Sequence, residues 1–223
     1  MQNFATTAPI AVVLDVPAGH IRFIAADRAD TNVEVLPANA GNSNDVKAAE
    51  RVSVAYADGV LRIEAAEAKS RILGNSGAVE VTVQLPAGSR VEAKTAAADF
   101  RSVGRLGDVT FEGAQGAVKL DETAAARLTL QAGDIAVGRL GGPAEISTQK
   151  GDLRIAEALR GTVALSTQAG DISIGAGRGV SATLDAGTGL GRITNTLQNS
   201  EGATAGLNIH ATTAYGDITA RTL

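Results

Sequence analysis

The chain contains no cysteine and no tryptophan, and each absence excludes a kind of site. Among 223 residues there is no Cys and no Trp, and aromatic residues make up 3%. Without thiols the chain can hold neither disulfides nor thiolate-bound metal, so a small disulfide-stapled scaffold is excluded. Grooves that bind single-stranded nucleic acid stack bases on aromatic side chains, and sugar platforms do the same with sugars, so both lose support.

Long apolar runs and basic blocks are missing as well. No run approaches the roughly 18–20 consecutive apolar residues that span a bilayer, so we expect no transmembrane segment. The 24 acidic and 20 basic residues are scattered singly and give a net charge of −4, so no basic stripe is offered to nucleic acid. The first basic residue is Arg22, so residues 1–16 lack the charged front of a secretory signal. These features predict a cytoplasmic protein, or a cell-surface protein if a leader has been removed.

A short phrase opening with glycine recurs six times in the second half of the chain. In five copies the glycine is followed by Asp, and a short strand-like segment comes next; the copies are residues 107–111, 133–137, 151–155, 170–174, 191–195 and 216–220. Glycine adopts positive φ without steric cost, and Asp bonds nearby backbone N–H groups. Each copy therefore predicts a tight corner followed by a short strand.

The spacing of the phrases distinguishes two all-β architectures. Asp134, Asp152 and Asp171 follow one another at intervals of 18 and 19 residues, with an unmarked apolar strand between successive copies. A sandwich or barrel also has a strand about every ten residues, but it gives no reason for every second strand to open with the same corner. We therefore predict a single-chain β-solenoid, a right-handed β-helix-like coil of short strands in which like strands stack in parallel.

The first 94 residues predict longer strands joined by hairpins. Pro-Ala-Gly occurs at residues 17–19 and again at 86–88, each time between two alternating strands, and is typical of a tight turn. Asp58-Gly59 predicts a two-residue hairpin. Asp45 is expected to cap a short helix over residues 46–50. We accordingly expect an N-terminal β-hairpin or sandwich-like cap, residues 1–94, and a solenoid, residues 95–223.

These patterns together resemble a bacterial β-strand-repeat family of adhesin-like proteins built on a domain of unknown function. The resemblance rests on the two Pro-Ala-Gly segments, the hairpin at residues 56–60 and the Thr-x-x-Gly-Asp phrases at residues 148–153 and 167–172. It spans essentially the whole chain and implies a strand-repeat scaffold without shared catalytic residues. Arg192 departs from the pattern because it stands where the other copies have Asp.

The repeated aspartates are the first candidate site: Asp108, Asp134, Asp152, Asp171 and Asp217. If they stack about 4.8 Å apart, neighbouring charges repel by roughly 1 kcal/mol in water and about 4 kcal/mol at an intermediate dielectric. A bound Ca²⁺ would relieve that repulsion. The favoured interpretation is that each carboxylate accepts backbone N–H groups at its own corner. Calcium-binding nonapeptide repeats need denser Gly and Asp, and Arg192 breaks the row.

Two histidines and two glycine-rich segments are further candidates. His20 and His210 each lie in an alternating strand without a second ligand nearby, so we expect surface positions rather than a metal ligand or general base. Residues 175–179 and 187–191 could cradle an anion with Arg178 as the counter-charge. Neither has the spacing of a phosphate-binding motif and no helix follows, so we expect wide corners.

Acidic pairs leave an enzyme open as the alternative. Asp121 with Glu122, or Glu64 with Glu67, could serve a carbohydrate-active hydrolase or lyase on a β-helix scaffold. Such an enzyme needs its carboxylates to converge in a groove, and the shortage of aromatic residues argues against a sugar groove.

The sequence thus favours a non-enzymatic scaffold or adhesin-like interaction protein, and no catalytic, cofactor-binding or metal-binding residue is assigned. Its expected partner is another protein or a second copy, bound through exposed strand edges; carbohydrate is less supported. The last phrase ends three residues before Leu223, so we expect the final turn of the coil to leave backbone groups unpaired and to self-associate.

Overall fold

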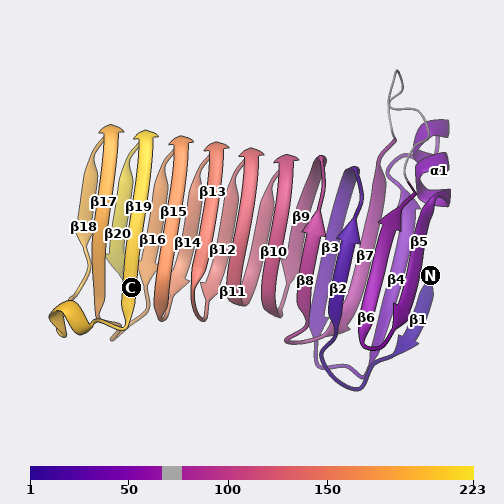
Figure 1. The fold of residues 1–223 in the computed structure, drawn as a ribbon, viewed down its shortest axis with the longest axis horizontal. Helices are drawn as coiled ribbons and strands as arrows, with labels where there is room; N and C mark the ends of the chain where they lie inside the picture. Colours follow the sequence, from indigo (N-terminus) through magenta and orange to yellow (C-terminus); the bar gives the residue numbers. More distant parts are fainter. Residues whose placement is uncertain (67–76) are drawn as a thin grey trace. The chain divides into compact units, whose positions relative to one another are not determined.

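The computed structural model describes residues 1–66 and 77–223, and it confirms an all-β solenoid-like fold (Figure 1). The chain forms two compact units, Met1–Gly116 and Ala117–Leu223. Each unit is built largely from parallel ladders, in which strands far apart in the sequence pair side by side. The predicted division into residues 1–94 and 95–223 stays a prediction.

The N-terminal unit combines parallel and antiparallel strands. Strands β2 and β8 lie in one parallel ladder with β6 and β10, and β3 lies between β7 and β9 in the other. The antiparallel pairs are β1 with β4, β4 with β7, and β5 with β6. The elements are β1 (Gln2–Ala5), β2 (Ala11–Asp15), β3 (Ala18–Ala26), β4 (Asp30–Pro37), α1 (Ser43–Glu50), β5 (Val52–Ala57), β6 (Val60–Ala65), β7 (Val79–Pro86), β8 (Arg90–Lys94), β9 (Ala97–Val103) and β10 (Arg105–Gln115).

The two Pro-Ala-Gly segments do not close hairpins, so that prediction is wrong. The strands they join, β2 with β3 and β7 with β8, pair with other strands, and β2 and β3 each lie in a parallel ladder. The reason is that a turn which presets φ can serve equally well as a corner between two ladders of strands. Gly19 shows this use, because a Cβ there would lie 1.8 Å from the Val79 carbonyl oxygen of the neighbouring strand.

The Asp58-Gly59 hairpin is confirmed, and the short helix forms with a different cap. Asp58 and Gly59 both adopt positive φ, 51° and 78°, between the antiparallel strands β5 and β6. Helix α1 begins at Ser43, and the Asn42 side chain accepts the N–H of Asn44. The Asp45 carboxylate instead accepts the N–H of Ala78, which ties the helix to the start of β7.

The C-terminal unit consists of two parallel ladders, and the prediction that like strands stack on like is confirmed. One ladder contains the marked strands β12, β14, β16, β18 and β20, and the other contains the unmarked β13, β15, β17 and β19. We call one unmarked strand with the marked strand that follows it a rung. The strands are β11 (Val118–Ala132), β12 (Ile135–Leu140), β13 (Ala144–Lys150), β14 (Leu153–Ala158), β15 (Gly161–Ala169), β16 (Ile172–Ala176), β17 (Ala182–Leu190), β18 (Ile193–Thr196), β19 (Leu207–Tyr215) and β20 (Ile218–Thr222), with a 3-10 turn at Gly202–Thr204.

The last two rungs stack in the reverse of their order in the sequence. Strands β19 and β20 pair with β15 and β16 on one side and with β17 and β18 on the other, so the C-terminal rung is an inner one (Figure 1). The terminal rung is β17–β18. The prediction that the last phrase of the sequence forms the exposed end is therefore wrong.

The side chains explain this order. At the first core position of the marked strands stand Ile135, Leu153, Ile172 and Ile218, each at most 1% exposed, whereas Ile193 of β18 is 45% exposed. At the next core position Asn195 of β18 lies in register with the buried Ala220. A buried amide without partners costs free energy, so the rung with Asn195 is stable only at an end.

Candidate functional site

The Gly-Asp corners form one continuous ladder of hydrogen bonds along the C-terminal unit. Asp134 Oδ1 accepts the backbone N–H of Asp152 at 2.9 Å, and Asp152 Oδ1 accepts that of Asp171 at 2.8 Å. Asp171 Oδ1 in turn accepts the N–H of Asp217 at 2.7 Å. This bond joins rung β15–β16 to rung β19–β20, although β17–β18 lies between them in the sequence. The repeated carboxylate therefore joins one rung to the next rung in space.

Arg192 ends this ladder and does not interrupt it. Asp217 Oδ1 accepts the Arg192 backbone N–H at 2.8 Å, and Asp217 Oδ2 accepts the guanidinium Nη2 at 3.3 Å. The Arg192 backbone N–H and guanidinium hold the pKa of the Asp217 carboxyl below its usual value. No further rung follows β17–β18 among the residues that the structure describes, so this position needs no carboxylate.

The glycine and the threonine of each phrase have structural roles of their own. Gly170 has φ +153°, and a Cβ there would lie 2.0 Å from the carbonyl oxygen of Gly151 in the preceding rung. Thr167 Oγ1 donates to that same Gly151 carbonyl at 3.2 Å, and Thr213 Oγ1 donates to the Gly170 carbonyl at 3.1 Å. The Thr-x-x-Gly-Asp phrase is thus a stacking element. Its threonine hydroxyl and its aspartate carboxylate bond to a neighbouring rung, and its glycine packs closely against the preceding one.

The aspartates do not gather into a metal centre. Among the described residues, no group of three or more His, Cys, Asp or Glu side chains could hold a metal ion. The ladder carboxylates accept N–H donors from the neighbouring corner, rather than from their own corner as the sequence predicts. Asp108, in the N-terminal unit, has a different partner, because it lies 3.7 Å from the guanidinium of Arg90.

Both histidines are exposed strand residues, as expected, and each pairs with an aspartate that sequence reasoning missed. His20 Nδ1 lies 3.4 Å from Asp99 on β9, and His210 Nδ1 lies 3.4 Å from Asp185 on β17. In both pairs the two residues are in register on adjacent parallel strands. His20 and Asp99 also line a shallow hollow of about 320 Å³ in the N-terminal unit.

The glycine-rich segments are less corner-like than predicted. Gly175 and Ala176 belong to strand β16, and residues 187–190 belong to β17, so wide corners are wrong for these residues. A Cβ on Gly175 would lie 2.3 Å from the Ala156 carbonyl oxygen. The neighbouring strand packs too closely for a side chain at this position, so glycine is required there. Turns do follow at Gly179, φ +74°, and at Gly191.

The acidic pairs lie on exposed strands. Glu64 of β6 is in register with Asp15 of β2, and Glu67 lies outside the described residues. Glu122 of β11 is in register with Arg139, whose guanidinium lies 3.3 Å from Glu157. The two hollows described in the N-terminal unit, one at His20 and one of about 350 Å³ at Arg90 and Asp108, include neither pair.

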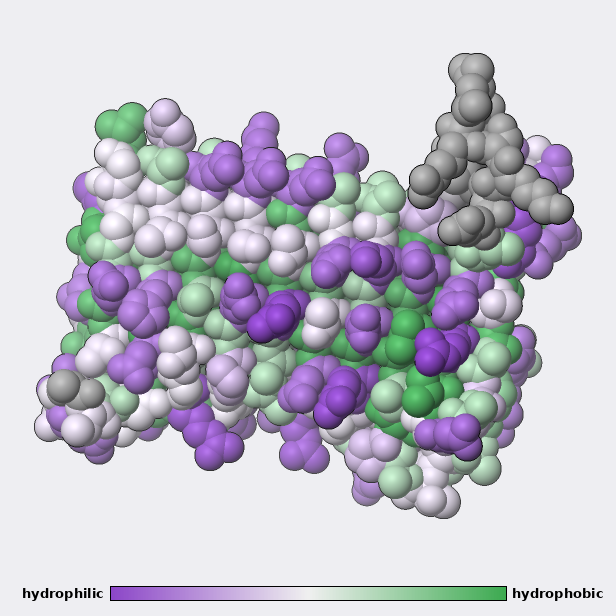
Figure 2. Space-filling model, viewed as in Figure 1, coloured by the Kyte–Doolittle hydropathy of each residue, from purple (hydrophilic) through white to green (hydrophobic). Residues whose placement is uncertain are grey.

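The outer face of the unmarked ladder carries two rows of uncharged polar side chains. The strand registers align four hydroxyl residues in one row, Thr129, Ser147, Ser166 and Thr212. Two residues further along the same strands stand Gln131, Gln149 and Gln168. Figure 2 shows a pale, weakly polar band over this part of the C-terminal unit. Sequence reasoning missed both rows because they appear only once the registers are known.

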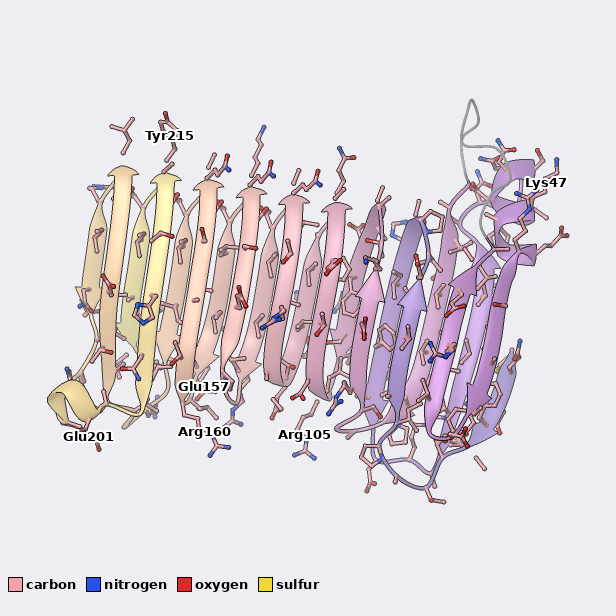
Figure 3. All side chains as sticks on the ribbon, in the orientation of Figure 1. Lys47, Arg105, Glu157, Arg160, Glu201 and Tyr215 are labelled. Atoms are coloured by element: carbon pink, nitrogen blue, oxygen red, sulfur yellow. The ribbon has the colours of Figure 1, made fainter. Side chains whose placement is uncertain are left out.

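The terminal rung and the end of the neighbouring strand β19 expose large apolar side chains. All four residues of β18 are exposed, and β17 and β18 each have a partner strand, among the described residues, along one edge alone. Ile193 is 45%, Leu190 67% and Tyr215 61% exposed. Leu190 and Tyr215 are in register, and Figure 3 shows Tyr215 at the end of β19, directed away from the sheet.

One comparison with a solved structure agrees with this fold. The structure of a candidate adhesin from Bacteroides fragilis NCTC 9343 aligns with 98% of this chain and 95% of its own, with a TM-score of 0.61 at 15% identity. That of a candidate adhesin from Parabacteroides distasonis ATCC 8503 aligns with the same shares, with a TM-score of 0.47 at 13% identity. A comparison with curated proteins finds no match. The Bacteroides fragilis likeness shows a shared fold.

The family match extends over nearly the whole chain. It begins at Ala11, the first residue of β2, and ends at Thr222, the last residue of β20, so it includes both units and every Gly-Asp phrase. The predicted kinship with a strand-repeat domain of unknown function is thereby confirmed: the chain belongs to the Toastrack DUF4097 family.

Proposed function

We propose that this chain is a non-enzymatic strand-repeat scaffold that acts as an adhesin-like interaction protein. The observation that carries the proposal is the use made of the repeated phrase. Its aspartates, threonines and glycines bond or pack against the neighbouring rung. The phrase therefore serves stacking, and the exposed outer face of the rungs remains available to a partner.

Two surfaces are available to a partner. The hydroxyl and glutamine rows offer a regular array of uncharged donors and acceptors, and the terminal rung offers unpaired strand edges. Unpaired edges bind further strands through backbone hydrogen bonds, which is how many proteins add a strand from a partner. A protein or a second copy of the chain fits such an edge better than a carbohydrate, which would need the aromatic platforms that this chain lacks.

The compartment is part of the proposal. No helix among the described residues is long and apolar enough to cross a membrane. The proposed compartment is the cytoplasm, and the cell surface is the alternative. An adhesin role would require the surface, so fractionation of cells that express the natural gene, with detection by antibody, distinguishes the two.

A polysaccharide panel tests the proposal against the carbohydrate-active alternative. The purified chain should release no reducing ends and no unsaturated sugars from any substrate. Turnover that Glu64→Gln or Glu122→Gln abolishes, while Glu145→Gln leaves it unchanged, would establish an enzyme. Glu145 is a fair control because it is an exposed strand carboxylate paired with Arg127 at 3.3 Å.

A further inference from the structure

We propose that the β17–β18 rung is a hinged end cap, which opens as one unit while the rest of the coil stays folded. The proposal is independent of the proposed function, because a scaffold and an enzyme built on this coil would share the cap. Its starting point is the stacking order. Strands β19 and β20 pair with β15 and β16 along their whole length. When the β17–β18 rung leaves, the remaining rungs of the C-terminal unit are therefore still stacked one on the next.

The two connections that lead into and out of this rung are tied to each other. Ser181 precedes β17, and its Oγ donates to Asn199 Oδ1, after β18, at 3.1 Å. The same Oγ accepts the Glu201 N–H at 3.1 Å. The N–H of Ala182 donates to the Gln198 carbonyl at 3.1 Å. The segment thus closes on itself at one end of the rung, and this end is where the hinge of the cap lies.

The cap buries little apolar surface of its own. Ala182 is the one buried residue of β17, and all four residues of β18 are exposed. In the neighbouring rung Leu207, Ile209 and Ile218 are at most 1% exposed. Burial of apolar surface supplies most of the free energy that holds strands together, and segments with few buried apolar groups open at lower cost than the core. The cap should therefore open more readily than any inner rung.

Opening uncovers the corner at Asp217. In the closed coil Asp217 Oδ1 accepts the Arg192 N–H at 2.8 Å. The N–H groups of Gly216 and Ile218 donate to the carbonyls of Leu190 and Arg192 at 2.9 and 2.8 Å. Departure of the cap frees the carboxylate and both N–H groups. The closed coil ends in Arg192, whose side chain has no acceptor, whereas the open coil ends in the carboxylate that every inner corner uses for stacking.

Hydrogen exchange followed by NMR on the full chain tests the proposal with matched amides. The reporter amides are those of Gly216 and Ile218, which donate to the cap. The control amides are those of Gly170 and Ile172, which stand at the same positions of the phrase but donate to the inner rung β19–β20 at 2.9 Å. The reporter amides should exchange roughly tenfold faster or more, at one common rate shared with β17, because opening of the cap exposes them together.

A reversible disulfide across the edge of the cap gives a second test. Thr194 of β18 and Thr219 of β20 are in register on neighbouring strands, about 4.8 Å apart, which a disulfide spans. The chain has no native cysteine to compete. Oxidised Thr194→Cys with Thr219→Cys should slow the reporter amides to the rate of the control amides, and reduction should restore them. Ser173→Cys with Thr219→Cys is the matched control, because it links two inner rungs and should leave the reporter amides fast.

Three results would overturn the proposal. Equal exchange of the reporter and control amides would show that the cap opens only when the whole unit unfolds. Exchange that slows residue by residue from one end of β17 would show fraying in place of a unit that opens at once. Reporter amides that stay fast in the oxidised Thr194→Cys and Thr219→Cys variant would show that they exchange by a route other than departure of the cap.

Discussion

The order of the last two rungs leads to a direct mutational prediction. Ile218 of β20 and Ile193 of β18 occupy the same position in their copies of the phrase, and they are 0% and 45% exposed. Truncation of a buried isoleucine to alanine costs about 2–5 kcal/mol, through lost transfer free energy and the cavity left behind. Ile218→Ala should therefore be strongly destabilising.

Ile193→Ala should cost about 1 kcal/mol or less, because nearly half of that side chain already lies in water and no closed cavity forms. For a chain of this length, 1 kcal/mol corresponds to roughly 2–4 °C in the melting temperature. Ile218→Ala should thus lower the melting temperature by about 4–20 °C and Ile193→Ala by a few degrees. Ile172→Ala, in the rung before β20, is the control and should behave like Ile218→Ala because Ile172 is 1% exposed.

Thermal and urea unfolding followed by far-ultraviolet circular dichroism measure both changes at the same dilute protein concentration. A coil stacked in sequence order would place β20 at the end and β18 inside. It would make Ile193→Ala the more damaging substitution. That result would refute the order of rungs, and with it the role of Arg192 as the end of the ladder.

Three further predictions concern the corners. Gly170→Ala should cost more than about 3 kcal/mol, since its Cβ would meet a backbone carbonyl at 2.0 Å, whereas Gly187→Ala, with open space around it, should be nearly neutral; equal melting temperatures for the two would contradict the corner geometry. Because the pKa of Asp217 is lowered in the folded chain, the stability it adds is present above about pH 4 and is lost as the pH falls through the folded-state pKa; Asp217→Asn should flatten this acid limb in a pH series of urea midpoints. EDTA should leave the melting temperature unchanged, because the carboxylates of the ladder accept N–H donors; a drop restored by Ca²⁺ would show that ions hold the row.

The sequence predicts the stacking of like strands because its signal is local. Between Asp134 and Asp171 the Gly-Asp pair returns after 18 and then 19 residues, and a period of two strands and two corners determines which strands pair. The Asp58-Gly59 hairpin is predictable for the same reason, since two adjacent residues set the turn. Pro17 to Gly19 misleads because a turn of given φ values can join antiparallel neighbours or strands of two different ladders.

The order of the terminal rungs depends on information that is spread along the chain. Arg192 and Asn195 are visible departures from the phrase, and a polar residue at a core position is a signal for an end. This signal can be recognised only once the strand register is known, because the register places Asn195 beside the buried Ala220. The His–Asp pairs and the two polar rows likewise require the register, because their members lie 18 to 79 residues apart.

The inner position of β19–β20 has a consequence for the route by which the chain folds. During synthesis β17–β18 emerges first, while the slot beside β15–β16 is still vacant, and the same Asp171 carboxylate that later receives Asp217 is free to receive Arg192. Growth by simple addition of each new turn would then trap the wrong neighbour. The segment that forms β19 and β20 must either arrive before that contact consolidates or displace it, so the final stage of folding is a competition between two segments for one place.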